Sequence, residues 1–202
     1  MKNLTFLIAL FALVQICNAG NPKDKTKVYA GEITMQDDQV VKGNLTYDYI
    51  KSQLLLQVED DSLTGYDATQ VKGFHFKNQE YVTYEFPNAN NLLVPTFFRL
   101  LWVSEGLKIL GRKEALAAGG QNKKGDESSV EYLYLYGSDA KVHAYLQVQG
   151  DQSKILDNGL IAKMTRVYFR AVKQYASDHK LDFDDQKDLI KILEYYNSLK
   201  TK

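Results

Sequence analysis

The spacing of apolar residues changes once along this chain of 202 residues, and this change constrains the fold more than any other feature. From Lys27 to about Val148, apolar and polar residues alternate, which is the pattern of strands with one buried face. Beyond Gly150, apolar residues recur every three to four positions, as in amphipathic helices. Because the strands all precede the helices, the pattern predicts an α+β fold with an antiparallel sheet. We expect one domain, with an antiparallel β region at 27–150 and a helical region at 151–202 that packs on the sheet.

Short polar clusters divide the β region into hairpins and a meander. Asp and Asn favour turns, and such clusters predict turns or breaks at 37–39, 48–51, 59–61 and 88–91. Strands are predicted at 71–76 and 81–86 between them. The apolar segment at 97–113 has Gly106 at its centre, so we expect a hairpin that turns at Glu105-Gly106.

A polar stretch at 115–126 has no periodicity and is predicted to be a long flexible loop. After it, Tyr132, Tyr134 and Tyr136 alternate with leucines. Gly137-Ser138-Asp139 then turns the chain into a partner strand at 142–148, which makes this the clearest hairpin in the sequence.

Two helices are predicted in the last fifty residues. The first runs from about Gly159 to Ser177, with Asp184 as the N-cap of the second. The apolar stripe of the first comprises Ile161, Met164, Val167, Tyr168, Ala171 and Tyr175, and that of the second Leu189, Ile190, Leu193 and Tyr196.

The first 19 residues are interpreted as an export signal, followed by a short linker at 20–26. Lys2 gives a positive start, an apolar run extends from Leu4 to Ile16, and small residues precede a cleavage site near Ala19. We expect no lipid anchor at Cys17, because Gln15-Ile16 stand where a small residue should precede a lipidated cysteine. No second long apolar run follows, so the mature chain is expected to be periplasmic or secreted, with no membrane span.

Removal of this signal also removes the single cysteine and leaves 24 basic and 25 acidic residues. A cysteine-free mature chain has no disulfide, thiolate nucleophile or thiolate metal site. The even charge balance argues against a nucleic-acid partner, because a duplex binder needs a basic face.

Several short stretches together resemble a group of uncharacterised exported β-rich proteins of Gram-negative bacteria. The resemblance lies in strand and turn patterns over nearly the whole mature chain, and it implies a β-rich fold and a place in the cell envelope, with no catalytic residues. The stretches are Gly31-Glu32-Ile33-Thr34, Gly43-Asn44-Leu45-Thr46-Tyr47-Asp48, Val71-Lys72-Gly73-Phe74, Phe97-Phe98-Arg99-Leu100-Leu101, Glu105-Gly106-Leu107-Lys108-Ile109-Leu110 and Tyr195-Tyr196-Asn197.

No motif predicts a catalytic, cofactor or metal site. The three histidines, His75, His143 and His179, have no metal-ligand spacing, although a site assembled from all three by the fold stays open. The acidic residues between Asp182 and Asp188 lack the Gly and Glu of a calcium loop and are better explained by helix capping. Paired carboxylates for hydrolysis would have to be assembled by the fold.

The sequence is rich in tyrosine, with 14 Tyr among its 202 residues. Tyr132, Tyr134 and Tyr136 should share one face of a strand, and Tyr145 on the paired strand joins them if the register allows. Such a stripe suits a sheet surface covered by helices, and it also suits a groove that binds glycan, peptide or lipid. We favour packing over binding, and keep these four tyrosines as a candidate ligand-binding face.

Three functions remain open after these exclusions. The leading one is an exported, non-enzymatic binding or interaction protein of the bacterial cell envelope, whose partner is a protein, a glycan or a hydrophobic ligand. The alternatives are a periplasmic carrier of lipid or another hydrophobic ligand, and a hydrolase that uses fold-assembled carboxylates.

Overall fold

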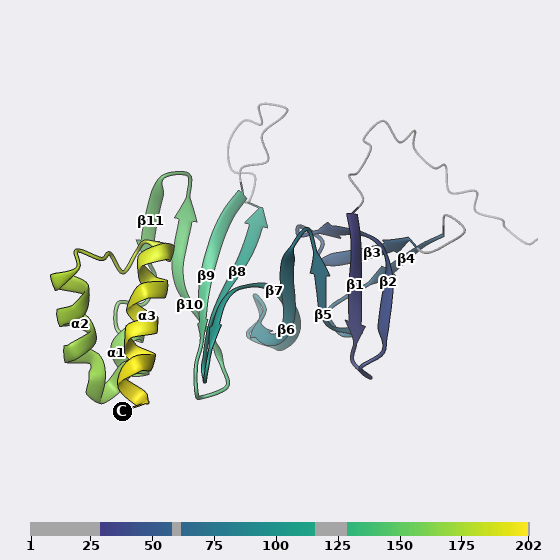
Figure 1. Ribbon diagram of the computed structural model, residues 1–202. Coiled ribbons are helices and arrows are strands. Elements are labelled where there is room, and N and C mark those ends of the chain that lie inside the picture. Colours follow the sequence, from purple (N-terminus) through teal and green to yellow (C-terminus); the bar gives the residue numbers. More distant parts are fainter. Residues whose placement is uncertain (1–28, 58–61, 116–128, 202) are drawn as a thin grey trace, which may run out of the picture.

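The computed structural model describes residues 29–57, 62–115 and 129–201. Within these ranges the chain forms one antiparallel sheet of eleven strands followed by helices, which confirms the predicted α+β fold (Figure 1). The expected export signal with Cys17, the linker at 20–26, the acidic turn at 59–61 and all of the polar loop at 115–126 except Ala115 lie outside the described residues.

The predicted hairpins at 71–86, 97–113 and 132–148 are present. The strands are β1 (Tyr29–Met35), β2 (Val40–Asp48), β3 (Gln53–Gln57), β4 (Leu63–Tyr66), β5 (Val71–Phe76), β6 (Gln79–Pro87), β7 (Leu93–Ser104), β8 (Leu107–Ala115), β9 (Ser129–Tyr136), β10 (Val142–Gln149) and β11 (Gln152–Ile155). Alternation did not predict β4 and β11, which have four residues each and form the two edges of the sheet.

The strand order along the sheet is β11-β10-β9-β8-β7-β6-β5-β1-β2-β3-β4. Most neighbours are joined by hairpins, but β1 lies between β2 and β5 and pairs with both. The first strand in the sequence is therefore an inner strand of the sheet.

The short connection from β4 to β5 forces the first half of the sheet to curl. In a flat sheet these strands would lie four spacings apart, which is about 19 Å. Residues 67–70 give the chain a reach of at most about 18 Å, and a turn between Asp67 and Gln70 shortens it further. The strands β1–β5 therefore bend around a core of aliphatic and aromatic side chains that includes Ile33, Leu45, Leu54, Leu56, Val71, Phe74 and Phe97.

Gly43 in β2 permits the tight packing inside this curl. A Cβ atom at this position would lie 2.6 Å from the carbonyl oxygen of Gln57 and 2.7 Å from Cδ1 of Leu56. Both distances are below van der Waals contact, so only glycine lets β3 approach β2 this closely.

The two faces of the second half of the sheet carry separate cores. Phe98, Leu110 and Tyr134 are buried on one face, where β6 comes near β10. The opposite face carries leucines and isoleucines of β8–β10 beneath the helices, including Leu107, Ile109, Leu133, Leu135 and Leu146.

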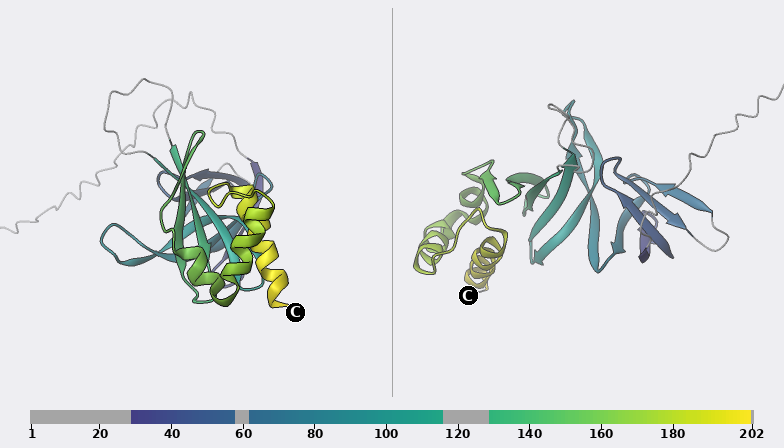
Figure 2. Two further views of the ribbon diagram at one scale, coloured as in Figure 1. Left: turned by 90° about the vertical axis from the view of Figure 1, so that its left-hand side faces the viewer. Right: turned by 90° about the horizontal axis from the view of Figure 1, so that it is seen from above.

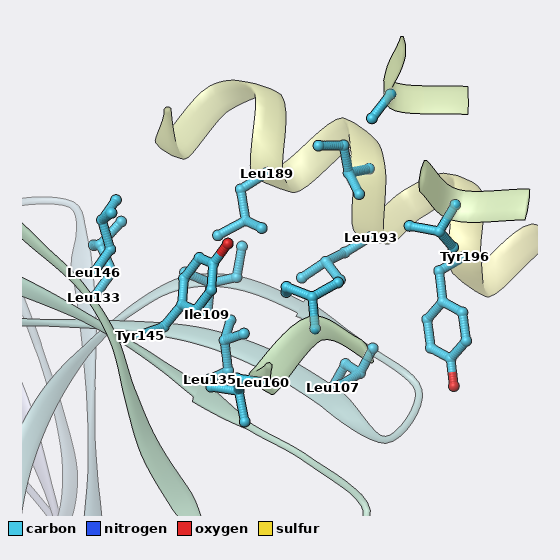
Figure 3. Close-up of a cluster of buried hydrophobic side chains, with 14 residues drawn as sticks. Leu107, Ile109, Leu133, Leu135, Tyr145, Leu146, Leu160, Leu189, Leu193 and Tyr196 are labelled. Atoms are coloured by element: carbon cyan, nitrogen blue, oxygen red, sulfur yellow. The ribbon is translucent and has the colours of Figure 1, made fainter. Parts of the chain in front are cut away.

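The helices α1 (Leu160–Thr165), α2 (Phe169–Asp178) and α3 (Gln186–Lys200) gather at one end of the molecule, beside β8–β11 and away from β1–β4 (Figures 1 and 2). Leu189 and Leu193 of α3 point toward Ile109 and Tyr145 of the sheet (Figure 3). The helical region thus packs on the sheet. No helix within the described ranges has the length and apolar character required to cross a membrane.

A short 3-10 helix, η1 (Arg166–Tyr168), interrupts the first predicted helix between α1 and α2. It shifts the helical phase, so the predicted stripe is wrong at Val167, which is 87% exposed. Val172 and Ala176 are buried instead. No Gly or Pro lies in this stretch to signal the interruption.

The N-cap of α3 is Asp185 rather than the predicted Asp184. Asp185 has an extended backbone, and its carboxylate accepts hydrogen bonds from the backbone N–H groups of Lys187 and Asp188. Asp184 instead accepts a hydrogen bond from the hydroxyl of Ser153 on β11.

Candidate functional site

Tyr132, Tyr134 and Tyr136 share one face of β9, as the alternation predicts. Tyr134 is only 2% exposed, and its ring packs edge-on against Phe98 with a centroid distance of 5.1 Å. Tyr136 stacks on Tyr84 of β6 at 4.5 Å. Tyr134 is therefore a core residue, with half-buried tyrosines on both sides along the strand.

Tyr145 lies on the opposite face, because the hairpin register places Val142 opposite Tyr136 and Ala144 opposite Tyr134, so the next residue of β10 points the other way. The pairing with β9 shifts between Ala144 and Leu146, which leaves Tyr145 as the extra residue. Its ring lies under the helices (Figure 3), and its hydroxyl donates a hydrogen bond of 3.0 Å to the carbonyl of Phe183. Burial raises the pKa of Tyr145, and the nearby Asp184 adds to this effect. The four candidate tyrosines thus divide between two faces of the sheet.

A cavity of about 380 Å³ lies where β2, β7, β8 and the turn between β5 and β6 meet. Sequence reasoning missed this site, because its residues come from strands that are distant in the chain. We call it the central cavity. Aromatic, basic and other polar side chains line it: Tyr47, Tyr49, Phe76, Tyr81 and Phe97; Lys77, Arg99, Arg112 and Lys113; and Gln79 and Glu131.

The aromatic wall of the central cavity is a set of interlocked rings. Tyr81 stacks on Phe74 with nearly parallel planes and a centroid distance of 4.4 Å. Tyr47 packs edge-on against Tyr81 at 5.2 Å and against Phe97 at 5.8 Å. These rings come from β2, β5, β6 and β7, and their packing against one another holds them in place.

The phenol groups of this wall are held in the neutral form. Burial raises the pKa of Tyr47, and the neighbouring Tyr81 adds to the effect. Burial also raises the pKa of Tyr81, although the positive charge of Arg99 opposes it. Both hydroxyls therefore remain able to donate hydrogen bonds through neutral and mildly alkaline pH.

The floor of the central cavity is an ion pair between Arg99 of β7 and Glu131 of β9. Gly111 of β8 lies between them, and a Cβ there would be 3.1 Å from Oε1 of Glu131 and 3.0 Å from Cδ1 of Leu101. The lack of a side chain at Gly111 thus makes room for the pair. Both charged side chains are about one quarter exposed, at 23% and 25%, so solvent or a ligand reaches them.

The rim carries cations that the described carboxylates do not neutralise. Lys77 sits in the turn between β5 and β6 with a φ of 53°, and its ammonium group lies 4.1 Å from the ring centroid of Tyr29. Lys113 is exposed on β8. Within the described ranges neither lysine forms an ion pair, whereas Arg112 pairs with Glu114 at 3.4 Å.

The histidines lie on three separate elements. His75 is exposed on β5, with the rings of the adjacent phenylalanines buried on the other face, as predicted. His143 Nε2 lies 2.7 Å from a carboxylate oxygen of Asp139, and Nδ1 of His179 lies 2.9 Å from the carbonyl oxygen of Tyr175. In the part of the chain that the structure describes, no group of three or more His, Cys, Asp or Glu residues is placed to hold a metal ion.

The central cavity therefore combines ring faces, neutral hydroxyls and a local excess of positive charge on one concave surface. Its described lining holds four cations, Lys77, Arg99, Arg112 and Lys113, against the carboxylate of Glu131. This arrangement suits a ligand that has both a ring and negative charge. Comparisons of the chain with models of protein families, with curated proteins and with solved structures find no match.

Proposed function

We propose that this protein is an exported, non-enzymatic binding protein of the bacterial cell envelope, and that its central cavity holds an anionic glycan. The observation that carries the proposal is the combination of a packed aromatic wall with four cations and one carboxylate in a single cavity. The expected export signal at 1–19 supports the placement in the envelope.

The chemistry of an acidic sugar matches each part of this lining. The C–H face of a sugar ring packs on aromatic faces such as that of Tyr81, while its hydroxyl groups pair with phenols and with the amide of Gln79. A sugar carboxylate or phosphate pairs with cations on the rim. Arg99 donates one hydrogen bond to Glu131. A guanidinium group has five N–H donors, so Arg99 has further donors for an anionic group of the sugar.

The same lining argues against the lipid carrier. A site for a hydrophobic ligand is lined predominantly by apolar side chains, with a few polar groups that fix orientation. The central cavity instead places five charged residues around its aromatic wall. Burying an alkyl chain there would desolvate these charges without replacing their hydrogen bonds.

The hydrolase alternative finds no pair of converging carboxylates in the described lining of the central cavity. Such a mechanism needs two converging carboxylates, one of them protonated at neutral pH. Glu131, the single carboxylate in the described lining of the central cavity, is held by Arg99. Hydrogen bonds lower the pKa of Asp139 and Asp157 elsewhere, which favours ion pairing over acid catalysis.

The proposal is tested by titrating the purified protein with an oligouronate and with a neutral oligosaccharide of the same length. We expect the oligouronate to bind and to shift the NMR signal of the Gly111 amide, which lies in the cavity floor. Higher salt should weaken the binding, because the rim charges are exposed. The neutral sugar should bind less tightly or not at all.

Two rim variants separate binding from folding. Lys77→Asn and Lys113→Gln each remove one exposed cation, and Asn suits the positive φ of position 77. Each should weaken the oligouronate by up to about fivefold, since an exposed ion pair contributes about 0.2–1 kcal/mol. Lys42→Gln, on the exposed side of β2, is the matched control and should change nothing. Equal affinity for charged and neutral sugars, or no shift at Gly111, would contradict the proposal.

A further inference from the structure

A second cavity of about 410 Å³ lies at the helical end of the molecule and shares no lining residue with the central cavity. Its walls are the turns β7–β8 and β9–β10, the helix α1 and the last turn of α3. We call it the helix-end cavity. Leu107, Leu160 and Met164 give it an apolar floor.

The two carboxylates at the helix-end cavity are already satisfied. Asp139 accepts hydrogen bonds from the ring of His143 and from the backbone N–H of Lys141. Asp157 accepts from the backbone N–H of Gly159 and from the ammonium group of Lys163. Among the described residues, the ion pairs of these carboxylates are with His143 and Lys163 and not with Arg166 or Lys200.

Two cations, Arg166 and Lys200, line the cavity together with Tyr196. The ammonium group of Lys200 lies 5.6 Å from the centroid of the Tyr196 ring. Arg166 is close enough that its charge opposes the rise that burial causes in the Tyr196 pKa. Among the described residues, no carboxylate forms an ion pair with Arg166 or Lys200.

Arg166 holds a backbone conformation that only glycine adopts readily. Its φ is 47° and its ψ is −116°, at the junction of α1 and η1. The junction is fixed by the buried Thr165, whose hydroxyl donates to the carbonyl of Ile161 at 2.8 Å, and by the bond from the N–H of Arg166 to Ala162. An arginine in a position suited to glycine points to a role for its side chain rather than for its backbone.

We propose that the helix-end cavity binds an organic anion, whose carboxylate or phosphate group pairs with Arg166 and Lys200 and whose apolar body packs on Leu160 and Met164. Two cations without carboxylate partners beside an apolar floor match such an amphipathic ligand. The inference is independent of the glycan proposal, because the two cavities use different residues.

The test is an NMR titration of the purified protein with phenyl phosphate, with benzyl alcohol and inorganic phosphate as partial ligands. Phenyl phosphate should shift the amide signals of Gly106 and Gly137, which line this cavity, and leave those of Gly43 and Gly111 unchanged. Benzyl alcohol and inorganic phosphate should each bind more weakly, because each lacks half of the recognised structure. No shift at Gly106 and Gly137 at millimolar phenyl phosphate overturns the proposal.

Variants of the two cations distinguish binding from structure. Arg166→Gly relieves the backbone conformation and removes the guanidinium group, so thermal stability should stay equal or rise while the affinity falls about tenfold or more. Arg166→Lys should retain part of the affinity. Arg170→Gln removes an exposed charge from the neighbouring α2 and should leave binding unchanged.

Lys200→Gln provides a second test, because this exposed residue lies in the last turn of α3 and its loss should not impair folding. We expect a fall of several-fold in affinity. Unchanged binding in both Arg166→Gly and Lys200→Gln would overturn the proposal. Sedimentation with vesicles that contain phosphatidylglycerol, compared with vesicles of phosphatidylcholine alone, identifies the source of the anion. Vesicle binding that Arg166→Gly abolishes indicates a lipid headgroup. Binding of phenyl phosphate without binding to vesicles indicates a free organic anion.

Discussion

At the scale of residues, the fold changes the pKa of several tyrosine hydroxyl groups. Tyr145 of β10 is buried between sheet and helices, and Tyr134 of β9 is buried on the opposite face. Tyr47 lies in the wall of the central cavity. Burial is the largest cause of the raised pKa in all three, so each favours the neutral phenol.

This predicts a loss of stability at alkaline pH. The folded state keeps the Tyr145 proton above pH 10, whereas the unfolded chain releases it near its ordinary pKa of about 10. The unfolded state then binds fewer protons, so the contribution of Tyr145 to the free energy of unfolding is constant below about pH 9 and falls as the pH rises above about 10. Urea unfolding at intervals between about pH 8 and pH 11 measures this slope.

Tyr145→Phe isolates the contribution of one phenol. The variant should lose about 1 kcal/mol at neutral pH, because the carbonyl of Phe183 loses its hydrogen bond, and its stability should fall less steeply above pH 10. Tyr132→Phe is the control, since this hydroxyl makes no hydrogen bond with the described residues. An equal alkaline slope in Tyr145→Phe and the unaltered protein would contradict the assignment.

At the scale of elements, the spacing of apolar residues predicted the strands and helices. It did not predict the local irregularities within them. Alternation located the hairpins at Gly106 and Gly137, because buried strand faces repeat every second residue. The bulge at Tyr145 shifts the register of β10 against β9, and the junction at Arg166 shifts the phase of the helix. No Gly or Pro marks either position. The shift at η1 is why the predicted helix stripe failed at Val167, whereas the register of the β9–β10 hairpin is what separates Tyr145 from the other tyrosines.

The start of α3 offers a direct comparison of two adjacent carboxylates. Asp185→Ala should lower the free energy of unfolding by about 1 kcal/mol, because two backbone N–H groups lose their acceptor. Asp184→Ala removes only an exposed bond from Ser153 and should cost no more than a few tenths of a kcal/mol. Urea unfolding of both variants measures the difference. A larger loss in Asp184→Ala would place the cap where the sequence alone predicted it.

At the scale of the whole molecule, one continuous sheet joins three cores that have no buried residue in common. Leu45 lies in the core of β1–β5, and Leu193 lies in the core beneath the helices. The central cavity lies on the strands that link these ends and on the turn beside them. Its position explains why sequence patterns did not reveal it: Tyr47, Arg99 and Glu131 become neighbours only when the sheet curls.

Loss of packing at one end should therefore affect that end first. Leu193 is fully buried, so Leu193→Ala should cost about 2–5 kcal/mol. Hydrogen exchange should show faster exchange of amides in α3 and β8–β10, with β1–β3 protected as before. Leu45→Ala should give the reverse pattern. Equal loss of protection at both ends in either variant would show that the sheet opens as a single unit.

The inner position of β1 has a further consequence for the order in which the chain acquires its structure. During synthesis β1 emerges before the other described strands, and it can form a hairpin with β2 as soon as β2 has followed. Its other edge stays without a partner until β5 has followed, because β2, β3 and β4 intervene in the sequence. Throughout that interval the growing chain exposes a row of free backbone N–H and C=O groups to other chains. This interval is therefore a time at which the newly made chain needs protection by a chaperone.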